Sequence, residues 1–161
     1  MTIAKPTMPL HAADPPRKGI SSEGRSRIMR AIRAKDTKPE LLVRRVVHAL
    51  GFRYRLHRPD LPGKPDLAFG PLRKAIFVHG CFWHSHPDAK CVNSRMPRSN
   101  RDYWLPKLRR TVERDAENIS SLKADGWTVM VVWECETKNI ARLRSRLRRF
   151  LSNSDSARIS R

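Results

Sequence analysis

The stretch KPDLAFGPLRKAIFVHG, residues 64–80, decides the fold because it predicts two short strands joined by a turn. The run PDLAF ends at Gly70-Pro71, a dipeptide that turns the chain, and the apolar run AIFV follows directly. Asp66 opens the first of these strands and His79 ends the second. An antiparallel pairing of the two strands would therefore bring a carboxylate and an imidazole to the same edge of a sheet.

The segments on either side predict helices and two further strands. Helices are expected from Ser22 to about Ala34, from Thr37 to Gly51, over about 100–124 and over 137–151, and strands over 52–56 and 127–134. Thr37 and Glu40 form a capping-box pattern at the second helix. The expected buried faces of the last three helices are Leu41, Leu42, Val46, Val47 and Leu50; Trp104, Leu108, Val112, Ile119 and Leu122; and Ile140, Leu143, Leu147 and Leu151.

This order of elements predicts an α/β protein with a small mixed β-sheet flanked by helices. The length of 161 residues fits one domain, which we place at 21–151. Residues 1–20 carry four prolines and no periodicity, so we expect a flexible N-terminal tail. The polar segment 152–161 is expected to be a disordered C-terminal tail.

The charge of the chain points to a polyanionic partner. Lysine and arginine number 34 against 15 aspartate and glutamate, a formal net charge of +19. Such a charge repels itself unless a polyanion offsets it, and DNA or RNA is the commonest one. A merely soluble basic surface and an anionic membrane are weaker alternatives. No apolar run is long enough to cross a bilayer and residues 1–20 hold no secretory signal, so we expect a cytoplasmic protein without a membrane partner.

All three cysteines and one histidine form a pattern that suits zinc. Cys81, His86 and Cys91 follow each other in one loop as C-x4-H-x4-C, and Cys135 follows the strand 127–134. Zinc in structural sites takes four such nitrogen and sulfur ligands in a tetrahedron. Buried free cysteines beside a surface histidine are the alternative, and His84 competes with His86 as the fourth ligand.

A second set of residues suits phosphodiester chemistry. Pro-Asp is by itself a common turn dipeptide, so Asp66 gains meaning only together with His79 on the next strand and Glu40 on the preceding helix. A carboxylate can hold Mg²⁺, and a neutral histidine can take a proton from water near neutral pH.

Several motifs together resemble one family. MRAI, AKDTKPE, LPGKPDLAF, IFVHGCFWHSH, VERDAENISSLKADGW and VVWEC, spread in order over residues 21–136, resemble the very-short-patch repair (Vsr) endonucleases. The resemblance implies a restriction-endonuclease-like fold with a structural zinc. It also implies an enzyme that nicks DNA on the 5′ side of the thymine in a T:G mismatch left by deamination of 5-methylcytosine.

The resemblance also implies roles for individual residues. Asp66 and the backbone carbonyl of Val78 match the magnesium site, and His79 and His84 match the two active-site histidines. Glu40 and Asp115 match acids that support the histidines. Cys81, His86, Cys91 and Cys135 match the zinc ligands, with Cys91 the least well supported because its interval from His86 is longer than in the family. We assign His84 as the general base and His79 as a phosphate contact or acid, and the reverse assignment stays open.

Aromatic side chains in the zinc loop suit insertion into DNA. Phe82 and Trp83 are adjacent rings in a basic, polar loop, and Trp104 joins them by the resemblance. Packing beneath the loop is the alternative, whereas Trp127 and Trp133 are assigned to the core. The segment EGRSRIMRAIR resembles the family's helix that reaches the minor groove, so Arg30 is a candidate phosphate contact, and Met29 and Ile32 are either DNA-inserting or core residues.

Two other functions remain open on the sequence. A zinc-stabilised DNA-binding module would need neither Asp66 nor His79, and a related nuclease of restriction or homing type would cut undamaged sites. Under the family hypothesis we expect a monomer that binds double-stranded DNA with a T:G mismatch on the bacterial nucleoid. Mismatch-repair proteins are candidate further partners.

Overall fold

The structure is a computed structural model that describes residues 35–96 and 100–153. The chain divides into two units, 1–34 and 35–161, and all described residues belong to the second. The predicted helix from Ser22 to Ala34 and the segments 1–20 and 154–161 lie outside the described residues.

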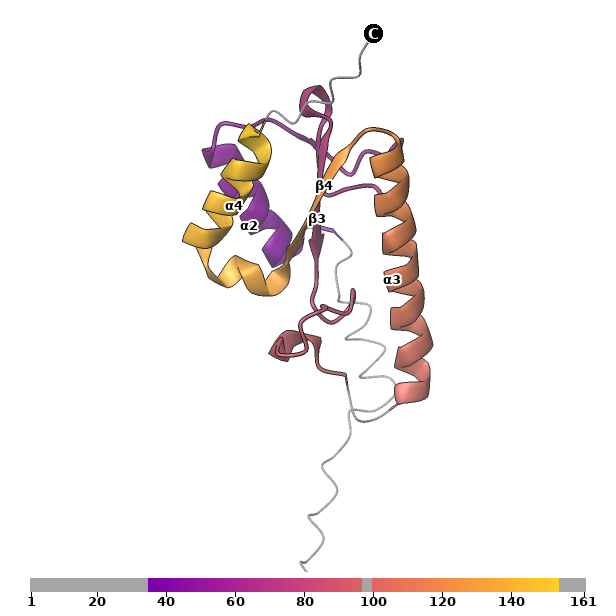
Figure 1. The fold of residues 1–161 in the computed structure, drawn as a ribbon. Helices are drawn as coiled ribbons and strands as arrows, with labels where there is room; N and C mark the ends of the chain where they lie inside the picture. The colour runs from indigo at the N-terminus through magenta and orange to yellow at the C-terminus, as the bar shows by residue number, and fades with distance from the viewer. Residues whose placement is uncertain (1–34, 97–99, 154–161) are drawn as a thin grey trace, which may run out of the picture. The chain divides into compact units, whose positions relative to one another are not determined.

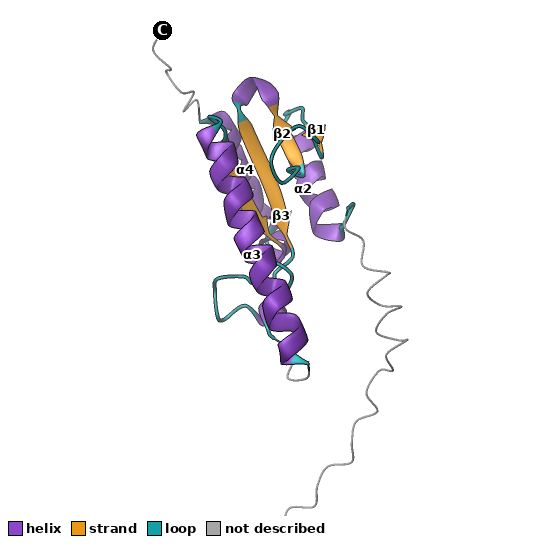
Figure 2. Cartoon of the chain, turned by 90° about the vertical axis from the view of Figure 1, so that its right-hand side faces the viewer, coloured by secondary structure: helices purple, strands orange, loops and turns teal. Residues whose placement is uncertain are grey.

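A four-stranded mixed sheet forms the centre of the described unit (Figures 1 and 2). Its strands are β1 (Arg55–Leu56), β2 (Leu67–Phe69), β3 (Lys74–His79) and β4 (Thr128–Trp133), in that order across the sheet. The first three pair antiparallel and β3 pairs parallel with β4. The predicted pair of strands in residues 64–80 and the mixed sheet are therefore confirmed, and the turn between the two strands is the short 3-10 helix η1 (Gly70–Leu72).

Helices cover both faces of the sheet. Helices α2 (Lys38–Ala49) and α4 (Ile140–Ser152) lie on one face, and α3 (Arg101–Ala124) lies on the other (Figure 1). Side chains alternate along β3, so Ile76 packs towards α2 and α4 whereas Ala75 and Phe77 pack with Leu122 of α3. His79 is the next alternate position after Ala75 and Phe77, so its side chain lies on the α3 face at the end of the strand.

The helix ends follow local sequence chemistry. The predicted capping box is confirmed: the Thr37 hydroxyl accepts from the Glu40 amide and the Glu40 carboxylate accepts from the Thr37 amide, both at 3.4 Å. The expected start of the last helix at residue 137 is wrong, because Glu134–Lys138 forms a 3-10 turn, η3. The Asn139 side chain then accepts from the Arg142 amide at 3.0 Å and caps α4.

Some predicted core positions are exposed. Leu41 is 41% exposed because α2 meets the sheet through Val43 and Val47. Val112 (41%) lies on the solvent side of α3, and Ile140 (53%) begins α4 one turn before its first buried residue. The predicted strand 52–56 pairs only at Arg55 and Leu56, whose side chains are exposed, although Phe52 and Tyr54 pack against the core.

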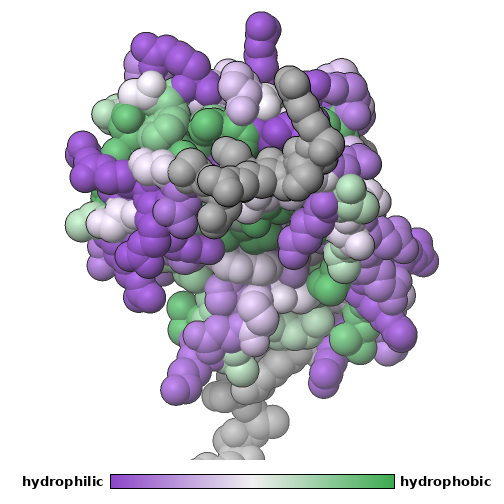
Figure 3. Space-filling view, turned by 45° about the horizontal axis from the view of Figure 1, so that its top comes forward, coloured by the Kyte–Doolittle hydropathy of each residue, from purple (hydrophilic) through white to green (hydrophobic). Residues whose placement is uncertain are grey.

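On the face shown in Figure 3, hydrophilic residues surround smaller apolar patches. Within the described ranges, no helix has the length and apolar character needed to cross a membrane.

Candidate active site and metal centre

Two histidines and an aspartate meet where β3 ends. The rings of His79 and His84 stack, with centroids 3.9 Å apart and planes 9° apart. Asp115 reaches them from α3, and its Oδ2 lies 2.5 Å from Nδ1 of His84. An ionised carboxylate can only accept a hydrogen bond, so it holds the His84 proton on Nδ1 and leaves the Nε2 lone pair free. The structure therefore brings together three of the predicted site residues.

The two imidazoles differ in their surroundings. His79 is 6% exposed, and burial lowers its pKa to about 4, with the neighbouring His84 adding to the decrease and Asp115 opposing it. His79 is therefore neutral at pH 7. His84 is half-buried on the loop that follows β3.

Asp66 lies beside the end of β3, as predicted from the paired strands. Its Oδ2 accepts a hydrogen bond from the Val78 amide at 2.6 Å, and Val78 directly precedes His79 in the chain. Burial raises the pKa of Asp66 to about 6, the nearby Glu40 adds to the rise, and the Val78 hydrogen bond and His57 oppose it. A buried carboxylate whose ionisation is this costly is a suitable ligand for a cation, because a bound cation offsets the charge.

His57 is a site residue that the sequence reasoning missed. Its Nδ1 lies 3.8 Å from Oδ1 of Asp66, and its Nε2 lies 3.1 Å from Oε1 of Glu40. Arg44 binds Glu40 and lies 3.1 Å from the same imidazole nitrogen. Glu40 thus contacts His57 and Arg44, while Asp115 is the acid that contacts His84. The available signal was the position of His57, at the end of the segment that pairs with the Asp66 strand.

The backbone at His57 is also unusual. Its φ angle is +43°, in the left-handed region that side chains with a β-carbon rarely adopt. Strained backbone of this kind is common at functional sites, where the surrounding structure holds it in place.

The three cysteines and His86 form a compact cluster, apart from the acid site. One ligand atom from each of Cys81, His86, Cys91 and Cys135 lies within 4.8 Å of the others. The Cys135 Sγ to His86 Nε2 distance of 3.5 Å is about the edge of a zinc tetrahedron with normal bond lengths. Burial raises the pKa of the Cys81 thiol to about 12, so this sulfur needs a cation to ionise. The donor set and its spacing therefore fit a structural zinc.

The aromatic residues of the loop gather against the start of α3. Phe82, Trp83 and Trp104 meet edge to face, with centroid distances of 5.1, 5.2 and 5.8 Å, and each is half-buried. Lys107 Nζ lies over the rings of Trp83 and Trp104, 5.6 Å from each centroid. Trp127 is buried in the core as expected, whereas Trp133 is only half-buried and packs against His79 and His86. Met29, Arg30 and Ile32 lie outside the described residues.

The fold and the site together define a class of protein. A basic α/β protein with an aspartate and paired histidines at one edge of a mixed sheet, beside a separate cysteine-histidine centre, has the architecture of a DNA endonuclease.

Comparison with known proteins identifies the family. The family model described as DNA mismatch endonuclease Vsr matches residues 20–90. The chain is 45% identical over 135 residues to the type II nicking enzyme V.XorIIP of Xanthomonas oryzae, covering 84% of this chain and 97% of that protein. It is 39% identical over 119 residues to DNA mismatch endonuclease Vsr of Escherichia coli, covering 74% of each chain. The type II nicking enzyme V.NaeI of Lentzea aerocolonigenes is 47% identical over 118 residues, covering 70% of this chain and 69% of that protein. The chain belongs to the Vsr endonuclease family and is a nuclease that acts on DNA.

Proposed function

We propose that this protein is a Mg²⁺-dependent mismatch endonuclease that nicks one strand on the 5′ side of the thymine in a T:G pair. The observation that carries the proposal is the meeting of Asp66 with the end of β3, next to the His79, His84 and Asp115 cluster, in a chain of the Vsr family.

The metal would be held by the Asp66 carboxylate and the Val78 backbone carbonyl. When bound there, Mg²⁺ would stabilise charge on the phosphate and on the leaving oxygen. Asp66 is oriented for this role by the Val78 amide, which occupies its Oδ2. His57 faces the other oxygen of the same carboxylate, with Nδ1 3.8 Å from Oδ1, and Glu40 and Arg44 in turn contact His57.

The histidines would activate water and contact the phosphate. In the hydrolysis, a water oxygen bonds to phosphorus, one water proton passes to Nε2 of His84, and the bond to the leaving oxygen breaks as that oxygen takes a proton from solvent water. Asp115 supports this step because it orients the imidazole and stabilises the imidazolium that forms. The low pKa of His79 favours a phosphate contact by the neutral ring over donation of a proton.

The cysteine-histidine centre would hold zinc and fix the loop that carries the site. Its first ligand, Cys81, is two residues after His79 and three before His84. The rings of Phe82, Trp83 and Trp104 lie on that same loop and on α3, and we assign them to unstacking the bases beside the mismatch. A mismatched pair costs less to unstack than a matched one, which would link recognition to damage.

A nicking assay on two duplexes, each under two conditions, tests the proposal. Duplexes carrying a T:G pair or the matched C:G pair in the same sequence are incubated with Mg²⁺ or with EDTA, and the nicked strand is mapped. We expect a single nick 5′ to the thymine, only with the mismatch and only with Mg²⁺. Equal nicking of the T:G and C:G duplexes, or nicking in EDTA, would contradict the proposal.

A second candidate function follows from the names of the relatives. Several, including V.XorIIP and V.NaeI, are named type II nicking enzymes, so nicking of a specific undamaged site is the alternative. The same assay, run with a library of matched duplexes, separates the two because only the alternative predicts nicks in undamaged DNA.

A further inference from the structure

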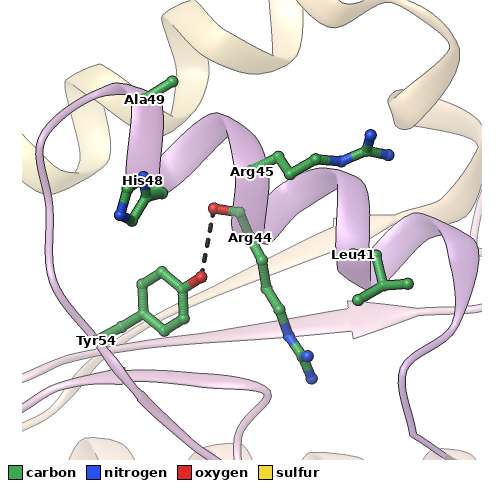
Figure 4. Close-up of a pocket in the computed structure, with 6 residues that line it drawn as sticks. All are labelled: Leu41, Arg44, Arg45, His48, Ala49 and Tyr54. Carbon is green, nitrogen blue, oxygen red and sulfur yellow. Dashed lines mark hydrogen bonds between the residues drawn. The ribbon is translucent and has the colours of Figure 1, made fainter.

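A groove lies on α2, beside the segment that leads into β1. It has a volume of about 550 Å³ and is lined by Leu41, Arg44, Arg45, His48, Ala49 and Tyr54 (Figure 4). The Tyr54 hydroxyl donates to the Arg44 carbonyl at 3.4 Å and closes one side. Figure 4 shows Arg44 and Arg45 leaving the helix in different directions. His48 and Tyr54 lie on one side of them in this view and Leu41 on the other. We call this feature the α2 groove.

The lining of the α2 groove is basic. Its lining residues include two arginines and a histidine, and none of them is acidic. Arg45 is exposed and makes no ion pair or side-chain hydrogen bond with any residue that the structure describes. Arg44, in contrast, already binds the carboxylates of Asp36 and Glu40. The exposed Arg45 side chain therefore suits an anion, and a guanidinium is well matched to phosphate oxygens.

The α2 groove shares one residue, Arg44, with the surroundings of the candidate active site. Arg44 lines the groove and also binds Glu40 and faces His57. The distance along α2 from Glu40 to His48 is about 12 Å at 1.5 Å per residue. One DNA strand advances about 3.4 Å along the duplex axis per phosphate, so this length matches three or four nucleotides.

We propose that the α2 groove binds the sugar-phosphate backbone of the duplex that flanks the cleaved bond, with Arg45 and His48 contacting phosphates. The inference rests on the proposed action on DNA and adds a surface that sets how the flanking duplex lies. An acidic protein is a weaker fit, because Leu41 is the only large exposed apolar side chain in the lining and stable protein interfaces need larger apolar anchors.

Binding measurements without catalysis test the groove. The Asp66→Asn protein serves as the background, in EDTA, so that no outcome depends on nicking. Arg45→Ala and His48→Ala are compared with Lys123→Ala, an exposed residue at the far end of α3 that removes the same charge as Arg45→Ala. Affinity for a long duplex with a central T:G pair, which fixes the position of the protein, is measured by fluorescence anisotropy over a series of salt concentrations. Two shorter duplexes, each trimmed on one side of the site, are measured in the same way.

The expected result has two parts. Arg45→Ala should weaken binding several-fold and reduce the salt slope by about 1, as loss of one phosphate contact requires. That loss should disappear on one of the two trimmed duplexes, the one that lacks the flank lying in the α2 groove, and persist on the other. His48→Ala should show the same dependence on the trimmed side with a smaller effect.

The inference is overturned if Arg45→Ala behaves like Lys123→Ala, or if its effect is the same on both trimmed duplexes. Either outcome would mean that Arg45 contributes only to the general positive charge. Because binding in EDTA is the readout, the groove can be rejected while T:G nicking is observed. Equally, the groove can be supported when T:G nicking fails.

Discussion

The pairing of Asp115 with His84 allows a quantitative test of the active site. Replacing Asp115 by asparagine keeps the shape of the side chain and removes the charge that lies 2.5 Å from Nδ1 of His84. The amide can also present its NH₂ group to the ring, which favours the tautomer with its proton on Nε2 and so blocks the base. Both effects act on the step in which His84 accepts a proton.

The expected magnitude follows from this hydrogen bond. Hydrogen bonds to a charged group are worth about 1.5–3 kcal/mol, and each 1.36 kcal/mol in barrier height is a factor of about ten in rate. The Asp115 side chain is 17% and the His84 side chain 23% exposed, so solvent screens part of the interaction. We therefore expect a decrease of about 10- to 50-fold in the rate of the chemical step.

Single-turnover nicking measures that step directly. Excess enzyme, saturating Mg²⁺ and a T:G duplex are used, so that product release does not enter the rate. Glu117→Gln is the control, because Glu117 is exposed on the same helix and its replacement removes the same charge. An Asp115→Asn rate within twofold of the Glu117→Gln rate would refute the role assigned to this pair.

Four further outcomes are expected. Asp66→Asn should abolish nicking. The same variant should also change stability: because the pKa of Asp66 is raised to about 6 in the folded protein, ionisation of this carboxyl destabilises the folded state as the pH rises from about 4 to about 6. In metal-free buffer at pH 7, the free energy of unfolding of the variant should therefore exceed that of the wild type by about 1–3 kcal/mol, and the two should match near pH 4. Urea unfolding measures this difference, and its absence would contradict the cost of the buried charge. His57→Gln should retain more activity than His57→Leu, because its amide can still reach the carboxylates of Glu40 and Asp66. The activity lost in His57→Leu should be partly recovered at high Mg²⁺. Equal activities of the two variants would leave His57 without a positioning role. Elemental analysis of the wild-type protein should find about one zinc per chain. Cys135→Ser should lose both the zinc and thermal stability. A wild-type protein that is stable without zinc would reject the structural metal. Trp83→Ala should reduce the preference for T:G over C:G more than it reduces overall DNA affinity, and unchanged discrimination would assign the ring to packing.

Features that depend only on neighbouring residues could be predicted from the sequence. The capping box at Thr37, the turn at Gly70-Pro71 and the apolar alternation of β3 are local, and the structure contains each of them. The Cys81, His86 and Cys91 spacing and the Vsr motifs were also readable, because they are runs of particular residues rather than contacts. The family follows from those motifs, and the comparisons confirm it.

Which distant side chains meet depends on how the elements pack in three dimensions. The same helical periodicity that marked Leu41 as core leaves it exposed, because the rotation of α2 against the sheet depends on packing through Val43 and Val47. His57 had no motif to mark it, yet the pairing of β1 with β2 and the position of α2 bring it between Asp66 and Glu40. Contacts of this kind join residues far apart in the chain, and their geometry is set by the balance of packing over the whole unit, which no local pattern records.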